Sequence, residues 1–142
     1  MRAAPVLFVL LMLTGCGAVQ VEPPVPEGEA ATACDGLAGL LPQTIDGADR
    51  TESVPRSPYV AVWDEGTVAL RCGVPRPARM APTDRLQEID GVGWFADPER
   101  PTLFTAVAAP LYVEVAVGGS HVAAEVLATL SKPIGQVSAQ PR

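Results

Sequence analysis

The clearest pattern of apolar and polar positions predicts a β-hairpin near the middle of the chain. Two β-prone runs, Tyr59–Trp63 and Thr67–Gly73, are separated by three residues that end in glycine, which suits a type I turn followed by a left-handed glycine. Such a turn pairs Trp63 with Thr67. Because side chains alternate between the two faces of a strand, one face then carries mainly aliphatic residues and is expected to face the core. The residues of that face are Val60, Val62, Val68, Leu70 and Cys72.

The apolar spacing also predicts one helix before this hairpin and one near the end of the chain. Residues 30–41 place apolar side chains at positions i, i+3, i+4 and i+7, and Pro42 is expected to end that helix. Ser120 has the chemistry of an N-cap for the second helix, and Pro133 is expected to end or kink it. The apolar face of the first helix consists of Cys34, Leu37, Ala38 and Leu41, and the stripe of the second consists of Val122, Ala123, Val126, Leu127 and Leu130.

Further strands are expected after the hairpin. Apolar runs bounded by glycine or proline predict strands at Val92–Phe95, Thr102–Ala108 and Leu111–Val117. Residues 43–58 and 78–90 are mostly polar and are expected to be loops, with one helical turn from Thr83 to Ile89. The predicted fold class is therefore α+β: an antiparallel sheet of about four to five strands, with an N-terminal and a C-terminal helix packed on one face.

The N-terminal part of the chain differs in composition from the rest. Residues 1–15 contain one early cation, Arg2, and a short apolar run that cannot cross a bilayer core about 30 Å thick, which is typical of a signal peptide. Residues 16–29 are rich in proline and glutamate and are interpreted as an extended tether. A single globular domain is expected over residues 30–137, followed by a short tail, 138–142.

The residues that close the apolar run, Leu13-Thr14-Gly15-Cys16, resemble a bacterial lipobox. The resemblance implies that Cys16 is acylated on sulfur, becomes the first residue of the mature chain and holds it by lipid on the outer face of the cytoplasmic membrane. The alternative is an ordinary signal peptide with an incidental cysteine. Cys34 and Cys72 then remain, and an even number of cysteines in an exported chain predicts a disulfide between them. Two free buried thiols are the alternative.

The charge of the mature chain excludes two classes of partner. Removal of residues 1–15 takes away one basic residue, Arg2, and leaves 9 basic and 16 acidic residues, a net charge of −7. Nucleic acid is therefore not expected as a partner, because its phosphates attract basic surfaces. Electrostatic adhesion of the protein surface to anionic lipid would require clusters of Lys and Arg. The lipid attached to Cys16, and not the protein surface, is therefore expected to bind the chain to the membrane.

No catalytic or metal-binding motif is recognisable in the sequence. The single histidine, His121, is adjacent to Ser120, and adjacent residues cannot adopt the alignment of a nucleophile–base pair. One histidine together with structural cysteines cannot complete a closed zinc site. Carboxylate pairs such as Asp90 with Asp97 arise by chance among 16 acidic residues. We therefore expect no catalytic residue, no metal and no cofactor.

The face of the hairpin opposite the predicted core is rich in aromatic residues. The predicted register places Tyr59, Trp63 and Arg71 there, with Arg71 opposite Tyr59, and Tyr112 joins them if the last strand lies in the same sheet. Tyr, Trp and Arg carry much of the binding energy at protein interfaces, so these four residues form a candidate binding patch. The alternatives are that Trp63 folds over the turn, that Arg71 stacks on Tyr59 as a cation–π pair, or that a loop covers the face.

Three blocks of the sequence resemble a family of small actinobacterial cell-envelope lipoproteins. They are Val68–Pro75, with a Leu-Arg-Cys-Gly-Val centre, Gly91–Phe95 and Tyr112–Val115. That family is catalogued as a domain of unknown function, so the resemblance implies an extracytoplasmic protein and brings no established activity. Members often carry an arginine just before the last strand, where this chain has Ala108-Ala109-Pro110.

Two functions from different classes remain open on the sequence. The first is a membrane-anchored, non-catalytic accessory or binding module of the cell envelope, whose partner is an envelope protein or a wall component. The second is an enzyme, or an enzyme subunit, of cell-wall metabolism with an unrecognised site. A flat aromatic patch would favour the module, and a pocket with buried carboxylates would favour the enzyme.

Overall fold

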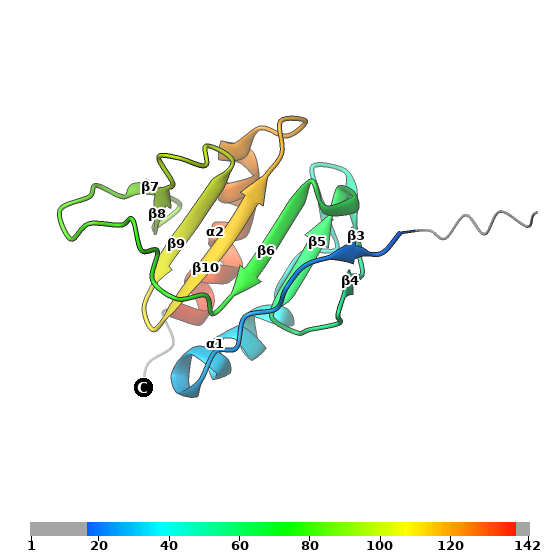
Figure 1. The fold of residues 1–142 in the computed structure, drawn as a ribbon, viewed down its shortest axis with the longest axis horizontal. Coiled ribbons are helices and arrows are strands. Elements are labelled where there is room, and N and C mark those ends of the chain that lie inside the picture. The colour runs from blue at the N-terminus through cyan, green and yellow to red at the C-terminus, as the bar shows by residue number, and fades with distance from the viewer. Residues whose placement is uncertain (1–16, 139–142) are drawn as a thin grey trace, which may run out of the picture.

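An antiparallel sheet of eight strands lies at the centre of the computed structural model, which describes residues 17–138 (Figure 1). Cys16 and the expected signal peptide therefore lie outside the described residues, as do residues 139–142 of the expected tail. The strands of this sheet are β2 (Thr44–Ile45), β3 (Ala48–Thr51), β5 (Val60–Trp63), β6 (Val68–Cys72), β7 (Gln87–Ile89), β8 (Val92–Ala96), β9 (Leu103–Ala108) and β10 (Leu111–Val117). Their order in space is β2-β3-β5-β6-β10-β9-β8-β7, so the hairpins β5–β6 and β9–β10 form the middle of the sheet.

The expected sheet of four to five strands is wrong, because the sheet has eight strands and a second, parallel sheet of two strands lies beside it. That small sheet consists of β1 (Val19–Gln20) and β4 (Ser53–Val54). The α+β class holds. The missed strands are only two to four residues long: the expected loop 43–58 contributes β2, β3 and β4, and the expected helical turn Thr83–Ile89 contains β7 instead.

A tight turn explains why residues 43–58 form strands. Asp46 and Gly47 both have left-handed backbone angles, with φ of 51° and 77°, and together they join β2 to β3. A two-residue Asp-Gly connection of this kind forms the hairpin turn whose twist matches that of the strands. The hairpin then extends the sheet through β3, where Arg50 pairs with Trp63 of β5.

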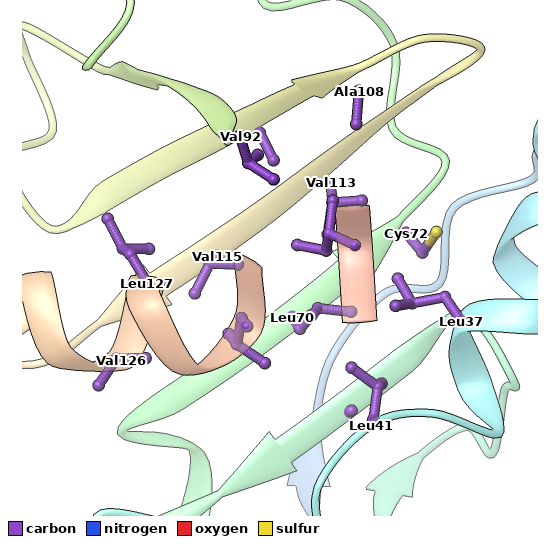
Figure 2. Packing of buried hydrophobic residues seen from close by; sticks show 14 of the residues in the cluster. Leu37, Leu41, Leu70, Cys72, Val92, Ala108, Val113, Val115, Val126 and Leu127 are labelled. Carbon is purple, nitrogen blue, oxygen red and sulfur yellow. The ribbon is translucent and has the colours of Figure 1, made fainter. Parts of the chain in front are cut away.

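Both helices pack on the same face of the sheet, as expected. They are α1 (Gly28–Ala38) and α2 (Ala123–Ser138). Figure 2 shows Leu37 of α1 and Leu127 of α2 directed toward Val113 and Val115 of β10 and Leu70 of β6. The alternation predicted for the last strand is confirmed, since its odd-numbered residues are buried and its even-numbered residues are half-buried on the other face. Burial of this aliphatic face is the main source of stability in a fold of this size.

The predicted helix ends need three corrections. α1 ends at Ala38, before Pro42, and α2 continues through the buried Pro133 to Ser138. Ser120 is not the N-cap of α2, because the helix begins at Ala123 and the carbonyl of Val122 accepts the first hydrogen bonds from the N–H groups of Glu125 and Val126. No helix among residues 17–138 is both long enough and apolar enough to cross a membrane.

The predicted disulfide between Cys34 and Cys72 is present and joins α1 to β6, with the two Cα atoms 5.7 Å apart. Both cysteines are buried in the core under the helices. Gly73, directly after β6, has φ of 86°, and a Cβ there would lie 2.5 Å from Cβ of Pro26 and 3.3 Å from Sγ of Cys34. The bridge and the N-terminal segment therefore meet at a position that only glycine can occupy.

The segment expected to be a free tether lies on the domain. Val19 and Gln20 pair with Ser53 and Val54, and the N–H of Val21 donates to the carbonyl of Val54. Further along, Pro24 is buried, and the carbonyl of Glu22 accepts a hydrogen bond of 3.0 Å from Nε of Arg71. Figure 1 shows this segment running from β1 to the start of α1. Residues 19–29, expected outside the globular domain, are thus part of it.

Candidate functional site

The four residues of the predicted binding patch are divided between the two faces of the sheet. The register of the hairpin differs by one position from the expected one, because Trp63 pairs with Val68 and not with Thr67. The connection contains four residues in place of three, and its first three, Asp64–Gly66, all have left-handed backbone angles. A shift of one residue moves every side chain of a strand to the opposite face.

Trp63 and Tyr59 consequently lie on the side of the helices. The Trp63 side chain is fully buried, and its Nε1 donates a hydrogen bond of 3.1 Å to the carbonyl of Pro42. Tyr59 is half-buried against the core. The core face predicted for this strand, which contained Val60 and Val62, is therefore wrong, and those two valines are buried on the opposite side.

Arg71 and Tyr112 do lie on the face away from the helices, but they do not form a patch with the other two residues. Arg71 is paired opposite Glu114 in the β-ladder and forms an ion pair with it at 2.9 Å. Tyr112 is half-buried opposite Val107 of β9. The structure therefore does not assemble the aromatic surface that the sequence suggested.

A polar pocket of about 480 Å³ lies at the edge of the sheet beside Trp63, and we call it the arginine pocket. It is an open depression bounded by β3, by β4 and by the segment that leads into β5. Its polar lining consists of Gln43, Arg50, Thr51, Glu52, Ser53, Arg56 and Ser57, and Pro58 and Val60 complete it. These residues belong to the segment expected to be a solvated loop and to the start of the hairpin.

Arg50 is the distinctive residue of the arginine pocket. Its guanidinium carbon lies 5.9 Å from the centroid of the buried Trp63 ring, a cation–π contact between cross-strand neighbours. Within residues 17–138 its side chain forms no ion pair and no hydrogen bond to another side chain. Its N–H groups are therefore available to a ligand, and a guanidinium matches the geometry of carboxylate and phosphate groups.

The other charged residues of the pocket largely neutralise each other. Arg56 forms an ion pair with Glu52, and both side chains are largely exposed. The hydroxyl oxygen of Ser57 accepts a hydrogen bond from the N–H of Tyr59 at 3.1 Å, which leaves its proton free to be donated. The pocket thus combines one uncompensated cation with neutral donors, an arrangement suited to binding an anion.

A second cavity, of about 570 Å³, lies where α1, the end of α2 and the β9–β10 turn meet. Its lining is mainly small and apolar and includes Ala33, Gly36 and Val137. Ala109 and Pro110 also contribute, at the position where the resembling family often has an arginine. Its polar side chains are those of Glu29, Thr32 and Ser138, and the hydroxyls of Thr32 and Ser138 donate to the backbone carbonyls of Gly28 and Gly135.

His121 forms contacts that sequence reasoning missed. Its Nε2 lies 2.8 Å from Oδ2 of Asp64, and its Nδ1 lies 3.1 Å from Oδ2 of Asp46. Its side chain is 6% exposed. The three residues come from the β5–β6 loop, the β2–β3 turn and the loop before α2, and we call this arrangement the His121 clip. His121 is 57 residues from Asp64 and 75 residues from Asp46 in the sequence, so no local motif predicts these contacts.

The His121 clip is better suited to a structural role than to catalysis. A carboxylate only accepts hydrogen bonds, so both ring nitrogens are fully satisfied when both carry protons. Two hydrogen bonds raise the pKa of His121 above its usual value: the one to Asp64 has the larger effect, and the one to Asp46 has the next largest. Neither nitrogen is then free to act as a general base, and Ser120 is exposed beside it without a base.

The carboxylate of Asp97 is likewise committed to local structure. It accepts hydrogen bonds from the N–H groups of Glu99 and Arg100, and its other oxygen binds the Arg100 guanidinium at 2.8 Å. The backbone hydrogen bond from Glu99 is the largest influence that lowers the pKa of Asp97. Across the described ranges, no group of three or more His, Cys, Asp or Glu residues is placed to hold a metal ion.

The family model described as "Protein of unknown function (DUF3515)" matches residues 4–142. The chain belongs to this family. No curated protein and no solved structure is detectably similar to it. Membership in the DUF3515 family therefore brings no activity with it, and the arginine pocket is the candidate site on geometry alone.

The His121 clip predicts a pH dependence of stability in this DUF3515 chain. Because the folded-state pKa of His121 is raised above the unfolded value of about 6.5, the stabilisation is fully present below that value and is lost as pH rises through the folded pKa. We expect the difference in urea midpoint between the wild type and His121→Gln to be larger at pH 5.5 than at pH 8.5. A difference that stays constant across this range would contradict the clip.

Proposed function

We propose that this protein is a lipid-anchored, extracytoplasmic binding module of the cell envelope and not an enzyme. The arginine pocket is the observation that carries the proposal. It offers the unpaired guanidinium of Arg50 and neutral donors, and it contains no imidazole. Its single carboxylate, Glu52, has a side chain 68% exposed and is paired with Arg56. Such a site binds and orients an anionic group but supplies neither a nucleophile nor a poised base.

The location rests on the N-terminal sequence. The resemblance of Leu13-Thr14-Gly15-Cys16 to a lipobox supports acylation at Cys16, and the sequence blocks noted above support membership among actinobacterial envelope lipoproteins. The disulfide between Cys34 and Cys72 supports an oxidising compartment, because thiols in the cytosol are kept reduced. The partners of this proposal are the membrane, through the anchor, and an anionic group of an envelope component.

Cys16→Ala is expected to abolish lipid attachment. Cells that express the wild type and are fed an alkyne-labelled palmitate should yield labelled protein in the membrane fraction, because two acyl chains at Cys16 suffice for stable anchoring where one is marginal. The variant should yield unlabelled protein. The matched control is Arg85→Gln, which changes an exposed side chain, leaves Cys16 in place and should keep the label. Label retained by Cys16→Ala would show that the lipobox interpretation is wrong.

A further inference from the structure

We propose that the arginine pocket binds the phosphate of a lipid headgroup in the same bilayer that holds the anchor. The inference rests on the proposed function, because it requires Cys16 to be lipidated. The ligand of the pocket is then a phosphate group, and Arg50 is the residue that contacts it. Gln43 and Ser57 are the additional neutral donors.

The position of the pocket relative to the anchor is the first observation in support. Val19 pairs with Ser53, and Ser53 lines the pocket. Only three peptide units join Cys16 to Val19, and three units of extended chain span at most about 11 Å. An acyl chain on Cys16 would therefore hold the β1–β4 sheet close to the membrane surface, without the spacing that a free tether would give.

The two ends of the sheet lie at different distances from the expected anchor. Figure 1 shows β1, β3 and β4 gathered at one end of the sheet, while β7 lies at the other. The pocket is bounded by β3 and β4, so it belongs to the end that carries the anchor. The loops around β7 are on the far end and would point away from the bilayer.

The charge of the pocket is the second observation. Two arginines and one glutamate give it a net charge of +1, on a mature chain whose net charge is −7. Glu52 is already paired with Arg56, which leaves Arg50 as the uncompensated cation. The Arg50 guanidinium carbon lies 5.9 Å from the centroid of the Trp63 ring, and its N–H groups have no side-chain partner within residues 17–138. A guanidinium with free N–H groups can bind phosphate oxygens in a bidentate manner.

The anchor explains why a lipid headgroup is preferred over free phosphate. A single arginine cannot by itself provide adhesion to a membrane, and the acidic surface does not assist it. Once the chain is tethered, however, headgroups are present at a high effective concentration, so a weak site is occupied. The volume of about 480 Å³ also exceeds what one phosphate fills and leaves room for the group esterified to it. The contact would fix the orientation of the domain on the bilayer.

The test uses the whole protein, purified from membranes with its anchor in mild detergent and labelled with ¹⁵N. The probes are dihexanoyl phosphatidylglycerol and inorganic phosphate, and the readout is the NMR signal of the Arg50 Nε–H group, identified by its loss in Arg50→Gln. We expect the lipid to shift this signal with an affinity at least about tenfold higher than that of inorganic phosphate. Backbone signals around the pocket should show at least about a tenfold weaker affinity for the lipid in Arg50→Gln, because a hydrogen bond to a charged group is lost.

Matched variants separate the possible results. Arg85→Gln changes an exposed arginine near β7, at the far end of the sheet, and should bind the lipid like the wild type. Arg50→Lys keeps the charge and the fold but not the bidentate geometry, and should bind with an intermediate affinity. Equal affinities for lipid and inorganic phosphate, or no shift with either, would overturn the inference.

The mass of the N-terminal peptide in the same preparation keeps this test distinct from that of the anchor. If Cys16 carries lipid and Arg50 does not respond to the probe, the pocket assignment is wrong while the anchor stands. If Cys16 carries no lipid, the proposed function is wrong, whatever Arg50 does.

Discussion

Replacing Cys34 and Cys72 together by alanine is expected to lower the free energy of unfolding by about 4 kcal/mol. The disulfide connects residues 38 positions apart, and in the chain-entropy account a cross-link over such a loop restricts the unfolded chain by an amount of this size. Both residues are buried, so the lost sulfurs also remove packing against the core. Because domains of this kind have total stabilities of about 5–15 kcal/mol, the double variant should fold poorly at 37 °C.

The measurement is urea denaturation followed by circular dichroism, with reduced wild-type protein as the control. Reduction should shift the wild-type midpoint close to that of the double variant, because both lack the same cross-link. Hydrogen exchange should further show the largest loss of protection in α1, since the bridge is its covalent link to the sheet. A double variant within about 1 kcal/mol of the oxidised wild type would refute the expected role of the bridge.

The central strands could be predicted from the sequence because one of their faces is covered by helices. In β10 the residues Val113 and Val115 face α2, and the intervening residues face the other side, so burial imposes a period of two. The strands at the two edges are different. β2, β3 and β7 are two to four residues long, and β2 and β7 each place a single apolar side chain, Ile45 and Ile89, in or against the core. Such short strands show no alternation of apolar and polar residues in the sequence from which they could be predicted.

The hairpin register depended on a single residue in a loop. Three-residue and four-residue connections both accommodate Asp64-Glu65-Gly66, and only the backbone angles of these residues decide between them. In the structure Thr67 belongs to the connection, and this one residue reverses the orientation of Trp63. Both strands of the hairpin could therefore be predicted while the side chains of β5 were assigned to the wrong face of the sheet.

The proline- and glutamate-rich composition of the N-terminal segment predicted that the segment cannot form a core of its own. The structure agrees, because the segment is held by contacts with the domain. It contributes mainly backbone contacts, such as the carbonyl of Glu22 bound to Arg71, and buries few side chains, Pro24 among them. The candidate site depends on this arrangement, because the pairing of Val19 with Ser53 brings the N-terminus beside the pocket. Contacts of this kind join distant parts of the chain and leave no periodic signal.

Trp63→Ala is expected to lower the free energy of unfolding by about 3–5 kcal/mol. The ring is fully buried between the sheet and the segment after α1, so its removal would leave a large cavity. The carbonyl of Pro42 would also lose the donor that Nε1 provides at 3.1 Å. The interpretation of Trp63 as an exposed binding residue predicts instead that the substitution hardly changes stability.

Two further variants, compared by denaturation with Trp63→Ala, distinguish packing from the hydrogen bond and from surface exposure. Trp63→Phe keeps an aromatic ring beneath Arg50 and loses the N–H donor, so its cost should be clearly smaller, about 1–3 kcal/mol. Tyr112→Ala removes an aromatic residue of the same predicted patch that is half-buried on the opposite face, and should cost about 1 kcal/mol or less. Equal losses for Trp63→Ala and Tyr112→Ala would mean that the two rings are similarly buried. The face assigned to Trp63 by the register of the hairpin would then be wrong, and so would the wall of the arginine pocket that this ring supports.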